Sequence, residues 1–94
     1  MALLLTLEGP LTPAMQEYLQ RGLRTAENQG AEVLILLLDT PGGSVNLMNN
    51  MVKEIRASRV PVVVFVAPSG AMAGSAGTVI TLAGHAAAMA PGTA

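Results

Sequence analysis

Cysteine and tryptophan are absent from this sequence, and tyrosine and phenylalanine occur once each. Without cysteine, the chain has no disulfide framework, no thiolate metal site and no thiol nucleophile. The shortage of aromatic rings for base stacking, together with a net charge of −1 and scattered basic residues, argues against a nucleic-acid partner. We therefore expect no nucleic-acid-binding function.

Charged residues are also scarce: they make up 12% of the 94 residues, whereas 51% are apolar. A chain of this length forms at most one small domain and buries only part of the surface that a complete fold buries. The composition is that of a core without its full solvated shell. We therefore expect residues 1–94 to form a single, partial domain, truncated relative to the complete fold.

Long uninterrupted apolar runs are absent as well, although no charged residue follows Arg59. Prolines and glycines between Pro61 and Pro91 break the apolar stretches, so that none reaches the roughly 18 residues of a membrane-spanning helix. The run Leu3–Leu7 is too short for a signal-peptide core and has no basic residue before it. We expect residues 1–94 to be soluble, without a transmembrane segment.

What the sequence does contain is a regular alternation of short aliphatic runs and amphipathic segments. Strands are predicted at residues 2–7, 33–38 and 62–66, with a weaker fourth run at 86–90. The run 33–38 is aliphatic without alternation, which is typical of a parallel strand covered on both faces.

Helices are predicted between these runs. Thr12 and Pro13 supply an N-cap and a first helical residue, and Gly30 ends that helix. Ser44 caps a second helix, and a third begins near Ser75. The βαβαβα order implies right-handed crossovers and a parallel sheet of α/β class. The residues predicted to face the core are Met15, Tyr18, Leu19, Gly22, Leu23 and Ala26 in the first helix and Val45, Met48, Met51, Val52 and Ile55 in the second.

Two unusual loops each follow directly after a predicted strand: residues 39–44 (DTPGGS) and residues 68–77 (PSGAMAGSAG). Sites in parallel sheets form at the carboxyl ends of strands, so we expect both loops at one edge. Ser75, at a strand-to-helix turn, is a candidate nucleophile, and the glycine pair in the first loop offers N–H donors for an oxyanion. Small residues in such a turn are equally compatible with a helix that simply packs close to the sheet.

Three motifs in this order carry a resemblance to a known family: LDTPGGS at residues 38–44, AGSAGT at 73–78 and MAPGT at 89–93. They resemble the NfeD-type, ClpP-class serine proteases, also called stomatin-operon proteases, and the likeness runs from about the first strand to the last residue. The Pro-Gly-Gly loop is more distantly similar to the signal peptide peptidase A and ClpP families. The resemblance implies a ClpP/crotonase-like protease domain, truncated in residues 1–94.

The resemblance also implies roles for individual residues. Ser75 would be the nucleophile, and the backbone N–H groups of Gly43 and Ala76 would form the oxyanion hole. An extended peptide would pair by β-addition with the substrate-binding loop, which comprises Gly42, Gly43, Ser44 and Val45. The family's general base is a lysine downstream of the serine, which we expect to lie beyond residue 94.

Within residues 1–94 we expect no side chain to replace that lysine. Lys53, on the polar face of the second predicted helix, is interpreted as a solvated charge. His85 is predicted at the far end of the helix that begins near Ser75, which disfavours a Ser-His pair. Asp39 is interpreted as a turn residue rather than a metal ligand or triad acid, and we expect neither a metal nor a cofactor.

We therefore predict a serine endopeptidase of the Ser-Lys dyad type that cleaves hydrophobic peptide segments, with its dyad incomplete in this stretch. Two alternatives stay open: a non-catalytic peptide-binding or scaffold module of the same fold, and an enoyl-CoA-hydratase-like enzyme, because that superfamily shares the fold. The resemblance further implies a membrane-associated full-length parent, a peptide or protein substrate such as a stomatin-like protein, and a homo-oligomer.

Overall fold

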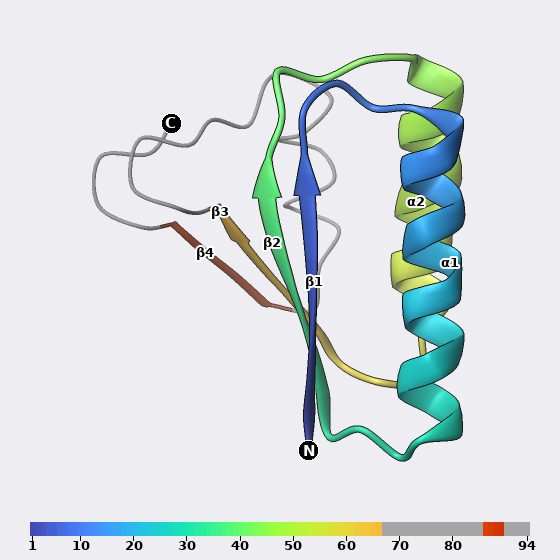
Figure 1. Ribbon diagram of the computed structural model, residues 1–94, viewed down its shortest axis with the longest axis vertical. Coiled ribbons are helices and arrows are strands. Elements are labelled where there is room, and N and C mark those ends of the chain that lie inside the picture. The colour runs from blue at the N-terminus through green and yellow to red at the C-terminus, as the bar shows by residue number, and fades with distance from the viewer. Residues whose placement is uncertain (67–85, 90–94) are drawn as a thin grey trace.

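The described part of the chain is a parallel sheet with two helices packed on it (Figure 1). The computed structural model describes residues 1–66 in full and the backbone of residues 86–89. The elements in chain order are β1 (Ala2–Glu8), α1 (Pro13–Asn28), β2 (Val33–Asp39), α2 (Val45–Ala57), β3 (Val62–Val66) and β4 (Ala86–Met89). These six elements confirm the predicted ones, whereas the third predicted helix, near Ser75, lies outside the described residues.

The four strands are all parallel and lie in the order β1-β2-β3-β4. Their register pairs Leu38 with Val66 and Val66 with Met89, and Glu8 at the end of β1 lies opposite Asp39. The carboxyl ends of the four strands therefore lie at one edge of the sheet. The predicted parallel sheet of α/β class is confirmed.

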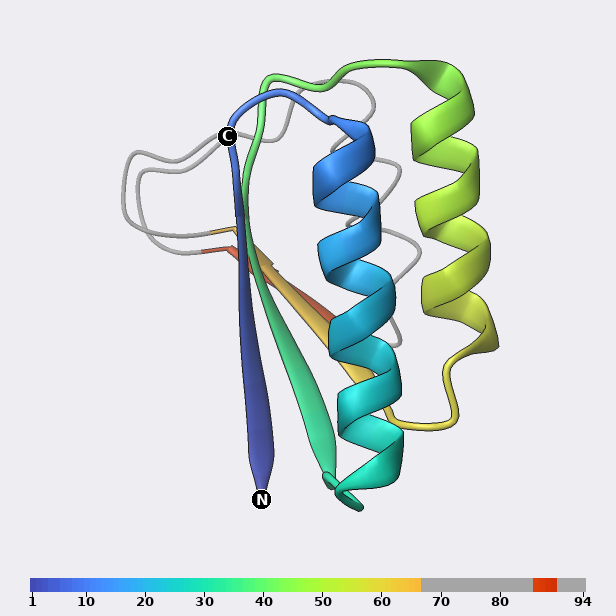
Figure 2. The same cartoon turned by 45° about the vertical axis from the view of Figure 1, so that its right-hand side comes forward.

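Both described helices lie on the same face of the sheet (Figures 1 and 2). Right-handed crossovers between successive neighbouring strands require this, because each crossover passes over the same side. Strand residues alternate between the two faces, and those on the helix-covered face are buried, apart from the half-buried Leu3. The core contains Leu5, Leu7, Leu34, Leu36, Leu38, Val62 and Val64 from the strands and Leu19, Leu23, Ala26, Met51 and Ile55 from the helices.

The opposite face of the sheet is largely apolar and only partly covered. Leu4 is 58% exposed, and Ile35, Leu37, Val63 and Phe65 are half-buried. The aliphatic run at 33–38 predicted that both faces of β2 are covered. Among the described residues, α1 and α2 cover one of these faces.

Helix α1 begins and ends as predicted. Thr12 Oγ1 accepts a hydrogen bond from the N–H of Met15 at 3.1 Å, and Pro13 occupies the first turn. Gly30, after the last turn, has a φ of +65°, the left-handed conformation that favours glycine at a helix end. In the stretches that the structure describes, neither α1 nor any other helix has the length and apolar character needed to span a membrane.

Two residues predicted to face the core are exposed instead. Tyr18 is 37% exposed, and its hydroxyl lies at the open edge of β1, where it accepts a hydrogen bond from the N–H of Thr6 at 3.4 Å. Val45 is 65% exposed because it is the first residue of α2 and follows the end of β2, beyond the strand residues on which α2 packs. Later in α2 the prediction is confirmed, since Met51 and Ile55 are fully buried.

Candidate functional site

The loop between β2 and α2, residues 40–44, lies at the carboxyl edge of the sheet (Figure 1). Because Leu38 pairs with Val66, the chain leaves β3 at the same edge at which it leaves β2. The second unusual loop, residues 68–77, follows β3 and lies outside the described residues. The predicted nucleophile Ser75, the second predicted donor Ala76, and His85 lie outside the described residues.

Both backbone polar groups of Gly42 are engaged in hydrogen bonds. Its N–H donates to Thr40 Oγ1 at 3.1 Å, and its carbonyl accepts from the N–H of Leu11 at 3.0 Å. Its φ of +110° is a conformation that side-chain-bearing residues rarely adopt. The backbone on either side of Gly42 is therefore fixed by residues of the protein itself.

The hydrogen bond from Leu11 sets the direction of the next N–H group along the chain. In a planar trans peptide, the carbonyl of Gly42 and the N–H of Gly43 point in opposite directions. Since that carbonyl is aimed at Leu11, the N–H of Gly43 points away from Leu11. Gly43 is exposed, and its N–H makes no hydrogen bond to any residue in the described ranges. The N–H of Gly43 is thus directed away from the loop between β1 and α1.

Position 43 has no room for a side chain. A Cβ built on Gly43 would lie 2.8 Å from the Cβ of Leu11, 3.1 Å from its backbone nitrogen and 3.2 Å from its carbonyl oxygen. Two of these three atoms belong to backbone, so they cannot be relieved by a rotamer change. Glycine at this position therefore permits the close approach of two loops.

The N-terminus of α2 adds a favourable potential for a negative charge near Gly43. Ser44 Oγ caps the helix by accepting from the N–H of Leu47 at 3.4 Å, and the first turn carries no acidic side chain. The helix dipole places partial positive charge at this end. An oxyanion next to Gly43 would therefore be stabilised by the donor and by the helix.

The predicted substrate-binding loop is divided between turn and helix. Val45 belongs to α2, and the carbonyl of Ser44 accepts from the N–H of Met48 at 2.9 Å. The N–H groups of Gly43 and Ser44 have no hydrogen-bond partner within the described part of the chain.

The remaining candidate side chains belong to the elements on either side of this loop. Lys53 is exposed on α2, in agreement with its interpretation as a solvated charge. Asp39 ends β2, and its backbone carbonyl accepts from the N–H of Gly9 at 2.9 Å. Over residues 1–66 and the backbone of 86–89, we find no group of three or more side chains suited to holding a metal ion.

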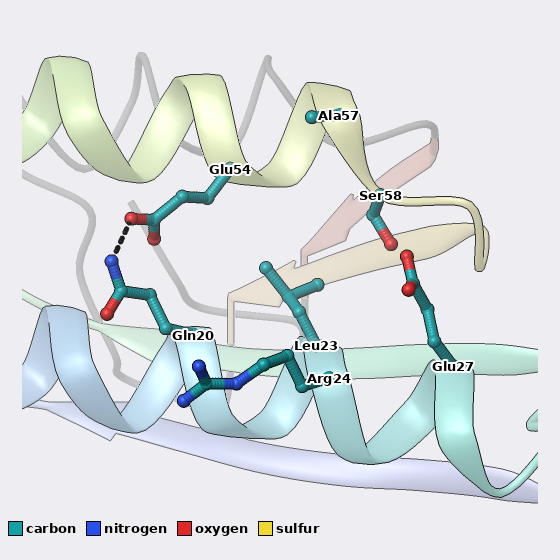
Figure 3. A pocket seen from close by; sticks show the side chains of 7 residues that line it. All are labelled: Gln20, Leu23, Arg24, Glu27, Glu54, Ala57 and Ser58. Atoms are coloured by element: carbon teal, nitrogen blue, oxygen red, sulfur yellow. Dashed lines mark hydrogen bonds between the residues drawn. The ribbon is translucent and has the colours of Figure 1, made fainter.

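A groove of about 380 Å³ lies elsewhere, between α1 and α2 (Figure 3). In it, Glu54 Oε1 accepts hydrogen bonds from Gln20 Nε2 at 2.6 Å and from Gln16 Nε2 at 3.1 Å, which tie the two helices together. None of its lining residues belongs to the loop at 40–44, so backbone geometry rather than this concavity marks the candidate site. The lining residues are Gln20, Leu23, Arg24, Glu27, Glu54, Ala57 and Ser58.

Sequence reasoning missed two residues that fix the glycine loop, Thr40 and Leu11. For Thr40 a signal existed, because a hydroxyl residue just before a turn often bonds the backbone N–H two residues later. For Leu11 no local signal exists, since its contribution is a backbone N–H supplied from a different loop.

The fold class follows from a distant structural likeness. The chain superposes on ClpP1 of Listeria monocytogenes, solved as an asparagine-to-aspartate mutant, with a TM-score of 0.86 at 20% sequence identity, over 96% of this chain and 52% of that one. At this identity the likeness shows the fold alone. The chain has a ClpP-like fold, as predicted.

The family follows from stronger similarities. Residues 3–94 match the NfeD1b N-terminal domain, and the chain belongs to this family. It is 45% identical over 87 residues to the membrane-bound protease PH1510 of Pyrococcus horikoshii, a match that covers 93% of this chain and 20% of that protein. The resemblance predicted from the three motifs is confirmed.

Two solved structures of 1510-N, a membrane-bound stomatin-specific protease, each match with a TM-score of 0.96. One is a serine-to-alanine mutant, 41% identical, and the match covers 99% of this chain and 45% of that one. The other is a lysine-to-alanine mutant in complex with a substrate peptide, 42% identical, with 99% and 42% covered. This chain thus spans about a fifth of its curated relative and less than half of these two solved chains.

Proposed function

We propose that residues 1–94 are one part of the catalytic domain of a serine endopeptidase of the Ser-Lys dyad type, and that they supply its nucleophile and its oxyanion loop. The observation that carries the proposal is the Gly42–Gly43 peptide, whose N–H is directed away from Leu11, at an exposed glycine. The similarity to a membrane-bound protease and to a stomatin-specific protease supports this reaction class.

In this proposal, Ser75 Oγ attacks the carbonyl carbon of the scissile peptide bond and forms a tetrahedral intermediate. The negative charge that develops on the carbonyl oxygen is stabilised by the N–H groups of Gly43 and Ala76 and by the N-terminus of α2. The carbonyl then re-forms as the bond to the leaving amine breaks, and water hydrolyses the resulting acyl-enzyme.

The proton of Ser75 must pass to a general base, because a serine hydroxyl is a weak nucleophile on its own. Lys53 does not suit this role, since it is exposed on α2 rather than placed at the carboxyl edge of the sheet. We assign the role to a lysine outside residues 1–94. That lysine accepts the hydroxyl proton and then donates it to the leaving amine.

The substrate in this proposal is an extended, hydrophobic segment of a protein. Its backbone would pair with the N–H groups of Gly43 and Ser44, and the 65% exposed side chain of Val45 would offer an apolar contact beside them. By similarity to the stomatin-specific protease, a stomatin-like protein is the substrate we propose. Membrane association of the full-length protein and assembly into a homo-oligomer belong to the same proposal.

The test is Ser75→Ala in the full-length protein, assayed for cleavage of hydrophobic peptides and for covalent labelling by a fluorophosphonate. The matched control is Ser58→Ala, which removes a hydroxyl that donates to the carbonyl of Val60 at 2.8 Å, just after the C-terminal end of α2. We expect Ser75→Ala to lose both activities and Ser58→Ala to keep both.

Other outcomes would replace the proposal. If Ser75→Ala still cleaves and labels like the parent, the nucleophile is another residue. If the parent binds a hydrophobic peptide without cleaving it, the protein is a peptide-binding module. Hydration of an enoyl thioester by the parent would instead identify the enoyl-CoA-type alternative.

A further inference from the structure

The loop between β1 and α1 runs beside the glycine loop. Gly9 N–H donates to the carbonyl of Asp39 at 2.9 Å, and Leu11 N–H donates to the carbonyl of Gly42 at 3.0 Å. The parallel pairing of β1 with β2 therefore continues past the strand ends into the two loops. The loop between β1 and α1 contains none of the predicted catalytic or substrate-binding residues, and it thus borders the candidate site.

We propose that Leu11 is a positioning residue for the oxyanion donor at Gly43, a role that rests on the proposed peptidase function. Its N–H holds the carbonyl of Gly42 and, through the planar Gly42–Gly43 peptide, sets the direction of the Gly43 N–H. Its backbone and Cβ form the surface on which the Cα of Gly43 rests. Leu11 acts through Gly43 and contacts no reacting atom.

The glycine pair needs such an external hold because glycine backbones rotate more freely than others. Thr40 Oγ1 holds the N–H of Gly42, which belongs to the peptide before that residue. The peptide after Gly42 is held by the bond from Leu11. Rotation of that second peptide would exchange the directions of its carbonyl and its N–H and would turn the donor away from a substrate.

Leu11 is itself well anchored. Its side chain is 6% exposed and belongs to the hydrophobic core. The direction of its N–H is therefore set by the packing of the sheet and helices, not by the exposed glycine loop. This makes the position of the oxyanion donor a consequence of core packing.

The sharpest test replaces the amide at Leu11 by an ester, through incorporation of the α-hydroxy analogue of leucine into the full-length protein. This removes the N–H and keeps the side chain. The matched control is the same replacement at Ala31, whose N–H donates to the carbonyl of Ala26 at 2.9 Å just before β2, at the other edge of the sheet. Leu11→Ala is a second variant, which keeps the N–H and shortens the buried side chain.

We expect the Leu11 ester to lower kcat for peptide cleavage about tenfold or more with little change in KM, since loss of one oxyanion donor costs about 100-fold to 1,000-fold. The Ala31 ester is expected to keep the parent kcat. Leu11→Ala should unfold at a lower denaturant concentration than the Leu11 ester, but its kcat should fall less than that of the ester. If the parent cleaves peptide and the Leu11 ester and the Ala31 ester have the same kcat, the positioning role is overturned.

A readout independent of activity separates this inference from the proposed function. The orientation of the Gly43 N–H bond, measured by residual dipolar couplings in isotopically labelled protein, should change in the Leu11 ester and not in the Ala31 ester. If that orientation changes while the parent cleaves no peptide, the peptidase function fails and the structural role of Leu11 stands. An unchanged orientation in the Leu11 ester overturns the role of Leu11, whatever the parent cleaves.

Discussion

The hydroxyl of Thr40, a completely buried side chain, accepts a hydrogen bond from the N–H of Gly42 at 3.1 Å. Buried polar groups almost always have such a partner, because an unpaired one loses its hydrogen bonds to water without compensation. Together with the bond from Leu11 to the carbonyl of Gly42, this bond holds the loop from within the protein. The direction of the Gly43 N–H is therefore set before any substrate binds.

Replacing Thr40 by valine, which has nearly the same shape, should remove one of the two hydrogen bonds that hold this loop. The N–H of Gly42, itself buried, would lose its acceptor, so we expect the free energy of unfolding to fall by about 1–3 kcal/mol. Cleavage of peptide by the full-length protein should fall as well. Denaturant unfolding and kcat measure the two effects, and Thr40→Ser, which keeps the hydroxyl, should retain more of both. If the valine and serine variants have the same free energy of unfolding and the same kcat, the hydroxyl does not hold the loop.

Substitution of Gly43 by alanine should displace the proposed oxyanion donor. The new methyl group would meet the Cβ, backbone nitrogen and carbonyl oxygen of Leu11, so the loop must move. We expect kcat to fall about 100-fold to 1,000-fold, as for loss of one oxyanion donor.

The control is Gly30→Ala. The φ of Gly30, +65°, also disfavours alanine, but no atom lies within 4 Å of the new Cβ. That control should lose about 1–2 kcal/mol of stability and keep its kcat. A Gly43→Ala variant with the parent kcat would count against the oxyanion hole.

A negative charge at Ser44 should slow the reaction without weakening the helix. Aspartate caps a helix about as well as serine, so Ser44→Asp should keep the stability that the present cap gives α2. Its carboxylate would oppose the developing oxyanion by on the order of 1 kcal/mol, which corresponds to about a fivefold lower kcat. The neutral cap Ser44→Asn is the control. Raising the salt concentration should narrow the difference between the two variants, because salt screens exposed charges. A difference that salt leaves unchanged would point to a steric cause.

The contact between α1 and β1 gives a prediction on stability alone. Gly22 is buried against the side chain of Leu5, and a Cβ at position 22 would overlap the end of that side chain. We expect Gly22→Ala to destabilise the protein by about 1–3 kcal/mol through overpacking. In the double variant with Leu5→Ala, the new methyl group would fill part of the space that the leucine leaves. Denaturant unfolding of the two single variants and the double variant should then give a favourable coupling of about 1 kcal/mol or more. Additive effects would mean that the two residues do not share this space.

The amino-acid sequence by itself determined the order and the approximate bounds of the described elements. The aliphatic run at 33–38, the caps at Thr12 and Ser44 and the helix end at Gly30 are all local patterns, and the structure has an element boundary or strand at each. The three motifs likewise identified the family, which the comparison of residues 3–94 confirms. These features were predictable because capping, turn formation and apolar periodicity depend on neighbours in the chain.

Only the tertiary structure decided which residues surround the glycine loop and which way its donor points. Val45 satisfies the helical periodicity of α2 and is nevertheless exposed, because its burial depends on where the sheet ends. The direction of the Gly43 N–H depends on a bond from Leu11, a residue two elements earlier, and on the register that places β1 beside β2. No local pattern encodes a hydrogen bond between two backbones that are distant in sequence, so this part of the site became visible only when the loops were placed side by side.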